Sequence, residues 1–239
     1  MYRCDIHIHT KETSNCGHIE AREIAAAYKR LGYDGICVTD HLQSGYLDRL
    51  NCRDDWQAYV DLHMRGYREA KKAGDALGLT VMLGIELRFP ENESDYLIYG
   101  IDEAWLRANP YICDMNHESF FKKFGGEVLI IQAHPYRNCD EVFCDCVHGL
   151  EIINCNPRHD SRNELALKLA RENPRLLRLC GSDTHEPGDE GRAAVLLEEP
   201  VRDSFELKAA IESRKFKLWC PVYQEIVDES EADLCNSTY

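Results

Sequence analysis

Short, continuous apolar runs alternate with longer segments of helical periodicity along this chain. Runs such as VLIIQA and GLEIIN lack the apolar–polar alternation of a half-exposed strand, which indicates strands buried on both faces. We expect strands at residues 2–8, 35–39, 80–85, 96–99, 127–133, 149–153, 176–180 and 193–197. We expect helices at residues 20–31, 54–77, 118–124, 161–172 and 204–213. Repeated strand–helix units predict an α/β fold with a parallel sheet, open or closed into a barrel, covered by helices.

The same pattern predicts one domain over residues 1–227. The chain of 239 residues is long enough for a full core, and we find no Pro-, Gly- or Ser-rich linker and no internal repeat. Gly32 and Gly78 each follow the last apolar position of a helical segment and are expected to end those helices. Residues 228–239, DESEADLCNSTY, form a polar, acidic tail that we expect to fray.

The net charge limits the kinds of molecule that the protein is expected to bind, and the cysteine content bears on the cellular compartment in which we expect it. The net charge of −14 disfavours long nucleic acids, but two or three bound divalent cations would reverse the field locally and admit a small phosphorylated substrate. Twelve cysteines would indicate disulfides in a small secreted protein. The start MYRCDIHIHT does not resemble a signal peptide, and no apolar run approaches the ~20 residues that span a bilayer. We therefore predict a cytoplasmic protein with reduced thiols and no membrane partner.

Side chains that bind metals recur where the expected strands end. They occur in the motifs DIHIHT, VTDH, LGIE, QAHP and GSDTH, and they are His7, His9, Asp40, His41, Glu86, His134, Asp183 and His185. Ligand sites of parallel α/β folds form outside the carboxyl ends of the strands. Mixed imidazoles and carboxylates suit zinc, manganese or iron. A single histidine at a strand end is more often an ordinary hydrogen-bonded residue, so the prediction depends on the joint pattern.

The number of candidates predicts more than one ion. A single ion takes only three or four protein ligands, and seven or eight candidates are present. Two neighbouring ions need a bridging carboxylate, for which Glu86 is the natural candidate. A water bridging such ions would become a hydroxide nucleophile near neutral pH.

At these residues the chain resembles the PHP superfamily, named after polymerases and histidinol phosphatases, and especially its stand-alone phosphoesterases. The resemblance runs in the family's order from DIHIHT, beginning at residue 5, to GSDTH, ending at residue 185. It implies a distorted (β/α)7, TIM-like barrel with a trinuclear site in its mouth. It also implies ligands for three metals: the first bound by His7, His9, Glu86 and Asp183, the second by Glu86 and His134, and the third by His41 and His185. Asp40 would support a ligand rather than bind a metal.

The chain departs from the family pattern at the third metal. Family members usually supply a further Asp or His shortly after the first motif, and here the segment reads KETSNCGHIE. Asn15, Cys16 or His18 could replace that ligand, or the third position could be weak or empty. Further ligands of the second metal are not identified by the sequence.

Several residues beyond the metal motifs are candidates for substrate contacts. Arg137 and Arg158 follow strand ends and could bind a phosphate bidentately, although surface ion pairs are equally expected. Asn154 and Asn156 are further candidates, and His159 could protonate a leaving group.

A second group of metal-capable residues lies outside these motifs, in the segment CDEVFCDCVH. Cys139, Cys144, Cys146 and His148 match no paired CxxC framework, so we favour ordinary thiols over a second zinc site. Cys155 could line the pocket, since it follows an expected strand.

The predicted function is hydrolysis of a small phosphate ester, of the histidinol phosphate or nucleotide mono- or bisphosphate type, by a metal-bridging hydroxide. One alternative is a 5'-3' exonuclease acting on short single-stranded oligonucleotides, and another is a non-catalytic metal-binding PHP domain. A related amidohydrolase is a third, but that class typically uses a strand-end lysine, and we find none. The sequence leaves the metal, the substrate and the oligomeric state open.

Overall fold

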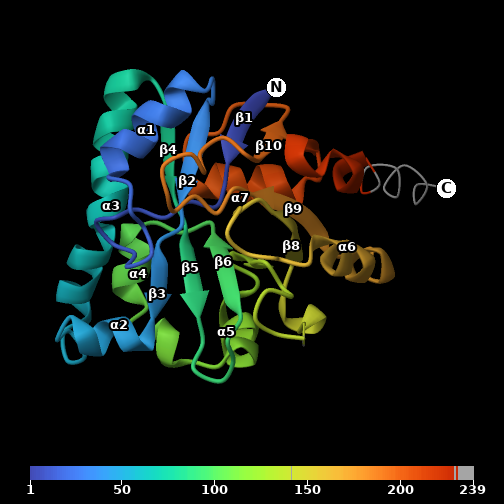
Figure 1. Ribbon diagram of the computed structural model, residues 1–239. Coiled ribbons are helices and arrows are strands. Elements are labelled where there is room, and N and C mark those ends of the chain that lie inside the picture. The colour runs from blue at the N-terminus through green and yellow to red at the C-terminus, as the bar shows by residue number, and fades with distance from the viewer. Residues whose placement is uncertain (141, 229, 231–239) are drawn as a thin grey trace.

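The computed structural model describes residues 1–140, 142–228 and 230, whose strands form two sheets (Figure 1). The five-stranded sheet has the order β11-β10-β1-β2-β4 and the six-stranded sheet the order β3-β5-β6-β7-β8-β9. The first sheet contains β1 (Tyr2–Asp5), β2 (Gly35–Val38), β4 (Thr80–Leu83), β10 (Ala194–Leu197) and β11 (Phe216–Trp219). The second contains β3 (His41–Gln43), β5 (Ile85–Arg88), β6 (Asp95–Tyr99), β7 (Leu129–Gln132), β8 (Gly149–Asn154) and β9 (Leu177–Gly181).

Helices cover these sheets from different sides. The α-helices are α1 (Ala21–Arg30), α2 (Ser44–Arg49), α3 (Trp56–Leu77), α4 (Glu103–Ala108), α5 (His117–Phe124), α6 (Asn163–Glu172) and α7 (Ser204–Glu212). Three short 3-10 helices are η1 (Ile112–Asp114), η2 (Cys144–Cys146) and η3 (Pro221–Tyr223). Helices α1 and α3 lie side by side next to β2 and β4, whereas α6 packs against β8 at the other side of the molecule (Figure 1).

Local sequence explains where the helices begin and end. The Asp55 side chain accepts a hydrogen bond from the backbone N–H of Ala58 (2.9 Å), which caps the start of α3. Gly78 ends the same helix in the left-handed conformation, with φ 68°, and Gly32 adopts φ 78° just after α1. The two helix ends predicted from these glycines are therefore confirmed.

The α/β prediction is confirmed, but the expected uniformly parallel sheet is wrong at two strands. Parallel pairs join β1 to β2, β2 to β4, β7 to β8 and β8 to β9. Strand β6 is antiparallel to β5 and β7, and β10 is antiparallel to β1 and β11. Only residues 89–94 separate β5 from β6, which is too short for the crossover that a parallel pair requires.

The elements that the sequence did not predict are short, and two of them result from broken strands. Strands β2 and β4 end at Val38 and Leu83, and the chain resumes as β3 and β5 in the other sheet. Hydrogen bonds continue across both breaks, from the Gly84 N–H to the Val38 carbonyl (2.8 Å) and from the Glu86 N–H to the Asp40 carbonyl (3.1 Å). The first strand likewise ends earlier than expected, and beyond it Ile8 forms an isolated parallel bridge with Thr184. The two sheets therefore meet where the candidate metal motifs lie.

The sequence also predicted a frayed C-terminal tail and no membrane-spanning segment. The fraying predicted for residues 228–239 falls largely outside the described residues, because 229 and 231–239 are not among them. Among the residues that are described, we find no helix whose length and apolar character would suit it to crossing a bilayer.

Candidate metal centre

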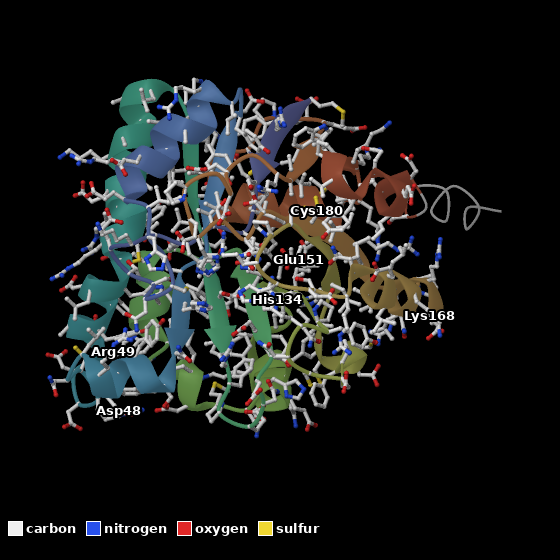
Figure 2. All side chains as sticks on the ribbon, viewed as in Figure 1. Asp48, Arg49, His134, Glu151, Lys168 and Cys180 are labelled. Atoms are coloured by element: carbon white, nitrogen blue, oxygen red, sulfur yellow. The ribbon has the colours of Figure 1, made fainter. Side chains whose placement is uncertain are left out.

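The predicted metal-binding side chains come together in one basin between the two sheets. His7, His9, Glu86, Asp183 and His134 are each at most 6% exposed. The His7 Nε2 atom lies 3.3 Å from an oxygen of Glu86 and 3.3 Å from an oxygen of Asp183. The Nε2 atoms of His9 and His134 lie 3.2 Å and 3.0 Å from Glu86 oxygens. Figure 2 places His134 near the middle of the molecule, far from the peripheral Asp48 and Lys168.

Four overlapping groups in this basin have potential ligand atoms within 4.8 Å of one another. They are His7, His9 and Asp183; His7, Glu86 and His134; His41, Glu86 and Asp95; and His9, Cys16, His41 and His185. The structure thus brings together all seven side chains predicted as ligands. Glu86 belongs to two groups, as expected of a carboxylate between two cations.

The chemistry of the basin fits divalent cations. Glu86 Oε2 and Asp183 Oδ1 are buried and accept no hydrogen bond from the described residues. The His41 Nδ1 atom lies 2.9 Å from Glu86 Oε2 but forms no hydrogen bond with it. Buried carboxylate oxygens without donors are costly, and a cation shared with the neighbouring imidazoles would satisfy them. The donor set of imidazole and carboxylate suits zinc, manganese or iron.

The electrostatics of the basin favour positive charge. Burial alone would raise the pKa of Glu86, but His41 and His7 hold it well below its usual range. Burial likewise opposes charge on His9, but Asp183 and Glu86 raise its pKa to about 9, despite the opposing effect of His41. The same carboxylates that favour a proton on these imidazoles would favour a cation, so protons and metal ions would compete for the ring nitrogens.

Glu151 fixes two of the imidazole-bearing segments. One of its oxygens lies 2.8 Å from His7 Nδ1, and the other accepts hydrogen bonds from the His134 backbone N–H (2.9 Å) and the Asn154 amide (2.9 Å). Glu151 and Asn154 are three residues apart and would face opposite sides of a regular strand. The register of β8 against β9 shifts between Glu151 and Ile153, and this bulge lets both side chains reach the basin.

Asp40 has a full set of donors and lies in none of the four groups formed by the described residues. It accepts hydrogen bonds from the Thr10 N–H (2.7 Å) and from the hydroxyl of Ser14 (2.6 Å). The same Ser14 oxygen accepts a hydrogen bond from the His41 N–H (2.9 Å) and lies 3.3 Å from His9 Nδ1. Ser14 therefore connects Asp40 to His41 and His9.

Two candidate ligands occupy strained backbone conformations. His134 has φ 29° and Asp183 has φ 55°, in the left-handed region that residues other than glycine rarely adopt. Such strain costs on the order of 1–3 kcal/mol and concentrates at functional sites. Each of the two residues lies two positions after the end of a buried strand, where the chain turns into the basin.

Three residues were proposed to supply the missing ligand of the third position, and among the described residues Cys16 is the one that enters a candidate group. The side chain of His18 is 58% exposed and lies 3.5 Å from Glu186. Asn15 is exposed as well. Burial alone would raise the pKa of the Cys16 thiol, but hydrogen bonds with neighbouring histidines lower it to about 6.

The two candidate phosphate-binding arginines have different surroundings. Arg137 is largely buried, with one guanidinium nitrogen 2.8 Å from Asp183 and another 2.5 Å from the Asn154 side-chain oxygen. Arg158 is more exposed and pairs bidentately with Asp189, at 2.8 Å and 2.5 Å. Arg137 and Asn154 thus border the basin directly, whereas Arg158 is engaged beside it.

The remaining residues of this region vary in their proximity to the basin. Asn156 donates a hydrogen bond to the Asp183 carbonyl (3.0 Å). His159 is largely exposed, and its partial burial together with the nearby charge of Arg137 lowers its pKa. The lowered pKa makes His159 a poor proton donor at neutral pH. Cys155 does not belong to the candidate groups among the described residues, and its sulfur lies 2.6 Å from that of Cys220.

The cysteine-rich loop forms no ligand group among residues 1–140 and 142–228. Cys139, Cys144 and Cys146 are only partly buried and are absent from the candidate metal groups. The Nδ1 atom of His148 accepts a hydrogen bond from the Ile130 backbone N–H (3.0 Å).

Sequence reasoning missed two acids of the basin. Asp95 opens β6, joins Glu86 in a candidate group and pairs with Arg88 (2.6 Å). Glu151 is the only charged residue of the apolar run GLEIIN, a signal that it needs a buried partner. Asp95 offered no such signal, because its strand is antiparallel and presents its first residue to the basin.

The fold and the basin define a class, a mixed α/β protein with buried, overlapping groups of candidate metal ligands. The model of the PHP domain family matches residues 5–210. The chain therefore belongs to the PHP domain family, as its resemblance implied. No curated protein matches the sequence.

Solved structures show the same fold at low identity. One is a two-domain protein from Bacteroides vulgatus containing a predicted PHP-like metal-dependent phosphoesterase, with 16% identity and a TM-score of 0.65. The match covers 92% of this chain, which spans only 64% of that protein's length. Another is an amidohydrolase from Chromobacterium violaceum with bound sulfate and no metal, with 16% identity, a TM-score of 0.55, and coverage of 93% of this chain and 99% of that one.

Proposed function

We propose that the protein is a metal-dependent phosphoesterase acting on a small phosphate ester. The observation that carries the proposal is the set of four overlapping ligand groups, in which buried oxygens of Glu86 and Asp183 lack hydrogen-bond donors among the described residues. Membership of the PHP domain family supports it, as does the name of the Bacteroides vulgatus neighbour.

The candidate ligands are assigned to three metal positions in this proposal. The first cation would be held by His7, His9, Asp183 and Glu86, the second by Glu86 and His134, and the third by His41 and His185. Asp95 lies in a group with Glu86 and His41 and would add a carboxylate there. Bound divalent cations would acidify water and neutralise charge on phosphate oxygens. Asp40 and Glu151 orient the ligands through hydrogen bonds, as residues behind metal ligands commonly do.

We also propose that residues 1–227 form one domain in which the two sheets are parts of a distorted (β/α)7 barrel. Seven strand positions support this: β1, β2 with β3, β4 with β5, β6, β7, β8 and β9. Each is paired with the next, and the Ile8–Thr184 bridge links the segment after β9 to that after β1. Strands β10 and β11 extend the sheet outside this ring.

The substrate-binding side of the basin is assigned to Arg137 and Asn154. Arg137 contacts Asp183 and Asn154, so a phosphate oxygen near the cations would meet a guanidinium already fixed in place. Arg158 is assigned a positioning role instead, because Asp189 also accepts the His185 backbone N–H (3.0 Å). The net charge of −14 supports a small substrate over a long nucleic acid.

The proposal is tested by assaying protein loaded with manganese or zinc on aryl phosphate, phosphomonoesters, nucleotide mono- and bisphosphates, short oligonucleotides and an amide. We expect His7→Ala and Asp183→Ala to abolish aryl phosphate hydrolysis while circular dichroism shows a folded protein. His18→Ala is the matched control and should retain activity, because that side chain is exposed outside the ligand groups.

Three outcomes would contradict the proposal. Full activity of either basin variant would refute the site. Preferred cleavage of oligonucleotides from the 5' end would favour the exonuclease alternative. Metal binding without hydrolysis of any ester would favour a non-catalytic domain.

A further inference from the structure

Cys16 brings a sulfur into a basin otherwise made of imidazoles and carboxylates. We infer that its thiolate is a ligand of the third metal position and makes that position selective for zinc over manganese. The inference rests on the metal centre proposed above and adds a ligand and a metal preference to it.

The geometry points to a coordination site. The Cys16 sulfur and one nitrogen each of His9, His41 and His185 all lie within 4.8 Å of one another. Four donors of this kind are the usual number for zinc, which binds sulfur and imidazole in tetrahedral sites. If the first cation uses His9, three donors remain, a number that leaves a zinc coordination position open to water or substrate.

The loop that carries Cys16 is built to hold this position. The Ser14 N–H donates to the Thr10 carbonyl (2.9 Å), and the His18 N–H donates to the carbonyl of His185 (2.8 Å). A Cβ atom on Gly17 would lie 2.6 Å from the Thr10 backbone, so a glycine is needed directly after Cys16. The tight turn and its bond to residue 185 place the thiol beside the histidines.

The metal positions differ in the softness of their ligands, and this difference predicts which metals each position prefers. The first and second positions offer imidazole and carboxylate, which manganese, iron and zinc all accept. A thiolate strongly favours softer metals such as zinc and is a poor ligand for manganese. We therefore expect zinc to persist in the third position when manganese fills the other two.

Cobalt substitution tests the inference without relying on activity. Metal-stripped protein is loaded with cobalt(II), and a sulfur-to-cobalt charge-transfer band is sought in the near ultraviolet. We expect the wild type and Cys144→Ser, a control thiol outside the basin, to show the band, and Cys16→Ser to lose it. Cys16→Asp is the second variant if the serine variant does not fold, and it should also lack the band while binding cobalt.

A competition experiment measures the selectivity. The wild type and Cys16→Asp are equilibrated with zinc in excess manganese, and bound metals are counted by mass spectrometry. We expect zinc affinity at one position to fall at least about tenfold in Cys16→Asp, since even disturbing a ligand's support costs 10–100-fold.

The failures of the two proposals are distinguishable. If the wild type binds cobalt but shows no sulfur-to-cobalt charge-transfer band, Cys16 is not a ligand, and the metal centre itself is unaffected. The same conclusion follows if the band persists in Cys16→Ser. Failure of the wild type to bind any metal would overturn both.

Discussion

Replacing Glu151 with glutamine should weaken metal binding without unfolding the protein. Its two oxygens face different groups, one toward His7 Nδ1 at 2.8 Å and the other toward the His134 N–H at 2.9 Å. Glutamine has the same shape but only one oxygen, so its amide group must face either the ring nitrogen of His7 or the N–H of His134. When it faces His134, two donors oppose each other, and when it faces His7, the ring loses its anionic partner.

The magnitude follows from the interaction that is lost. A hydrogen bond to a charged group contributes about 1.5–3 kcal/mol, and a tenfold change in affinity corresponds to about 1.4 kcal/mol. We therefore expect Glu151→Gln to lower metal affinity by about 10- to 100-fold, the range typical of groups that orient a ligand. The assay is titration of metal-stripped protein against a competing chelator, with circular dichroism to confirm folding.

A matched control makes the result interpretable. Glu127 lies on the surface and accepts a hydrogen bond from the Trp105 indole (2.7 Å), so Glu127→Gln makes the same chemical change away from the basin. We expect this variant to bind metal like the wild type. Unchanged affinity in Glu151→Gln, with zinc or manganese, would refute the reasoning about the role of Glu151.

Two further predictions concern stability. Gly66 lies within α3, and a Cβ atom there would lie 1.9 Å from the Thr10 hydroxyl oxygen, so Gly66→Ala should lower the midpoint of thermal unfolding. A Cβ atom on Gly45 would meet no atom within 4 Å, so Gly45→Ala should leave the midpoint unchanged or raise it. Equal midpoints for the two variants would contradict the packing around Gly66. Burial lowers the pKa of His63 from 6.5 to about 4, so the unfolded chain binds a proton at a higher pH than the folded protein does. The free energy of unfolding should therefore be highest above pH 6.5 and should fall by about 3 kcal/mol as the pH drops toward 4. Urea unfolding of metal-free protein at pH 7 and 4.5 should show a smaller acid loss in His63→Leu than in the wild type, and an equal loss would exclude this cause.

Much of the fold could be predicted because apolar runs and helical periodicity are local properties. Every predicted strand and helix exists, with ends displaced by a few residues. The directions of β6 and β10 could not be predicted from their own sequences, because a buried strand has the same composition in either orientation. The breaks at residues 39–40 and 84 also escaped detection, since they depend on how two sheets join.

The site was predictable to the extent that its residues occur in motifs. Histidines and acids at strand ends identified the basin before any coordinates, and these side chains do lie together. Asp95 could not be assigned, because its place depends on the antiparallel strand, and Glu151 reaches the basin only through a bulge. The sequence alone could not select Cys16 over Asn15 and His18 as the further ligand, because the selection depends on how the loop that carries these residues is folded.

The most direct test of the account is anomalous diffraction at the zinc absorption edge from crystals of zinc-loaded protein. We predict at least two peaks flanking the Glu86 carboxylate and separated by about 4 Å, the usual spacing of paired catalytic metals. An absence of peaks beside Glu86, or zinc bound only in the loop that contains Cys139 and Cys144, would contradict it.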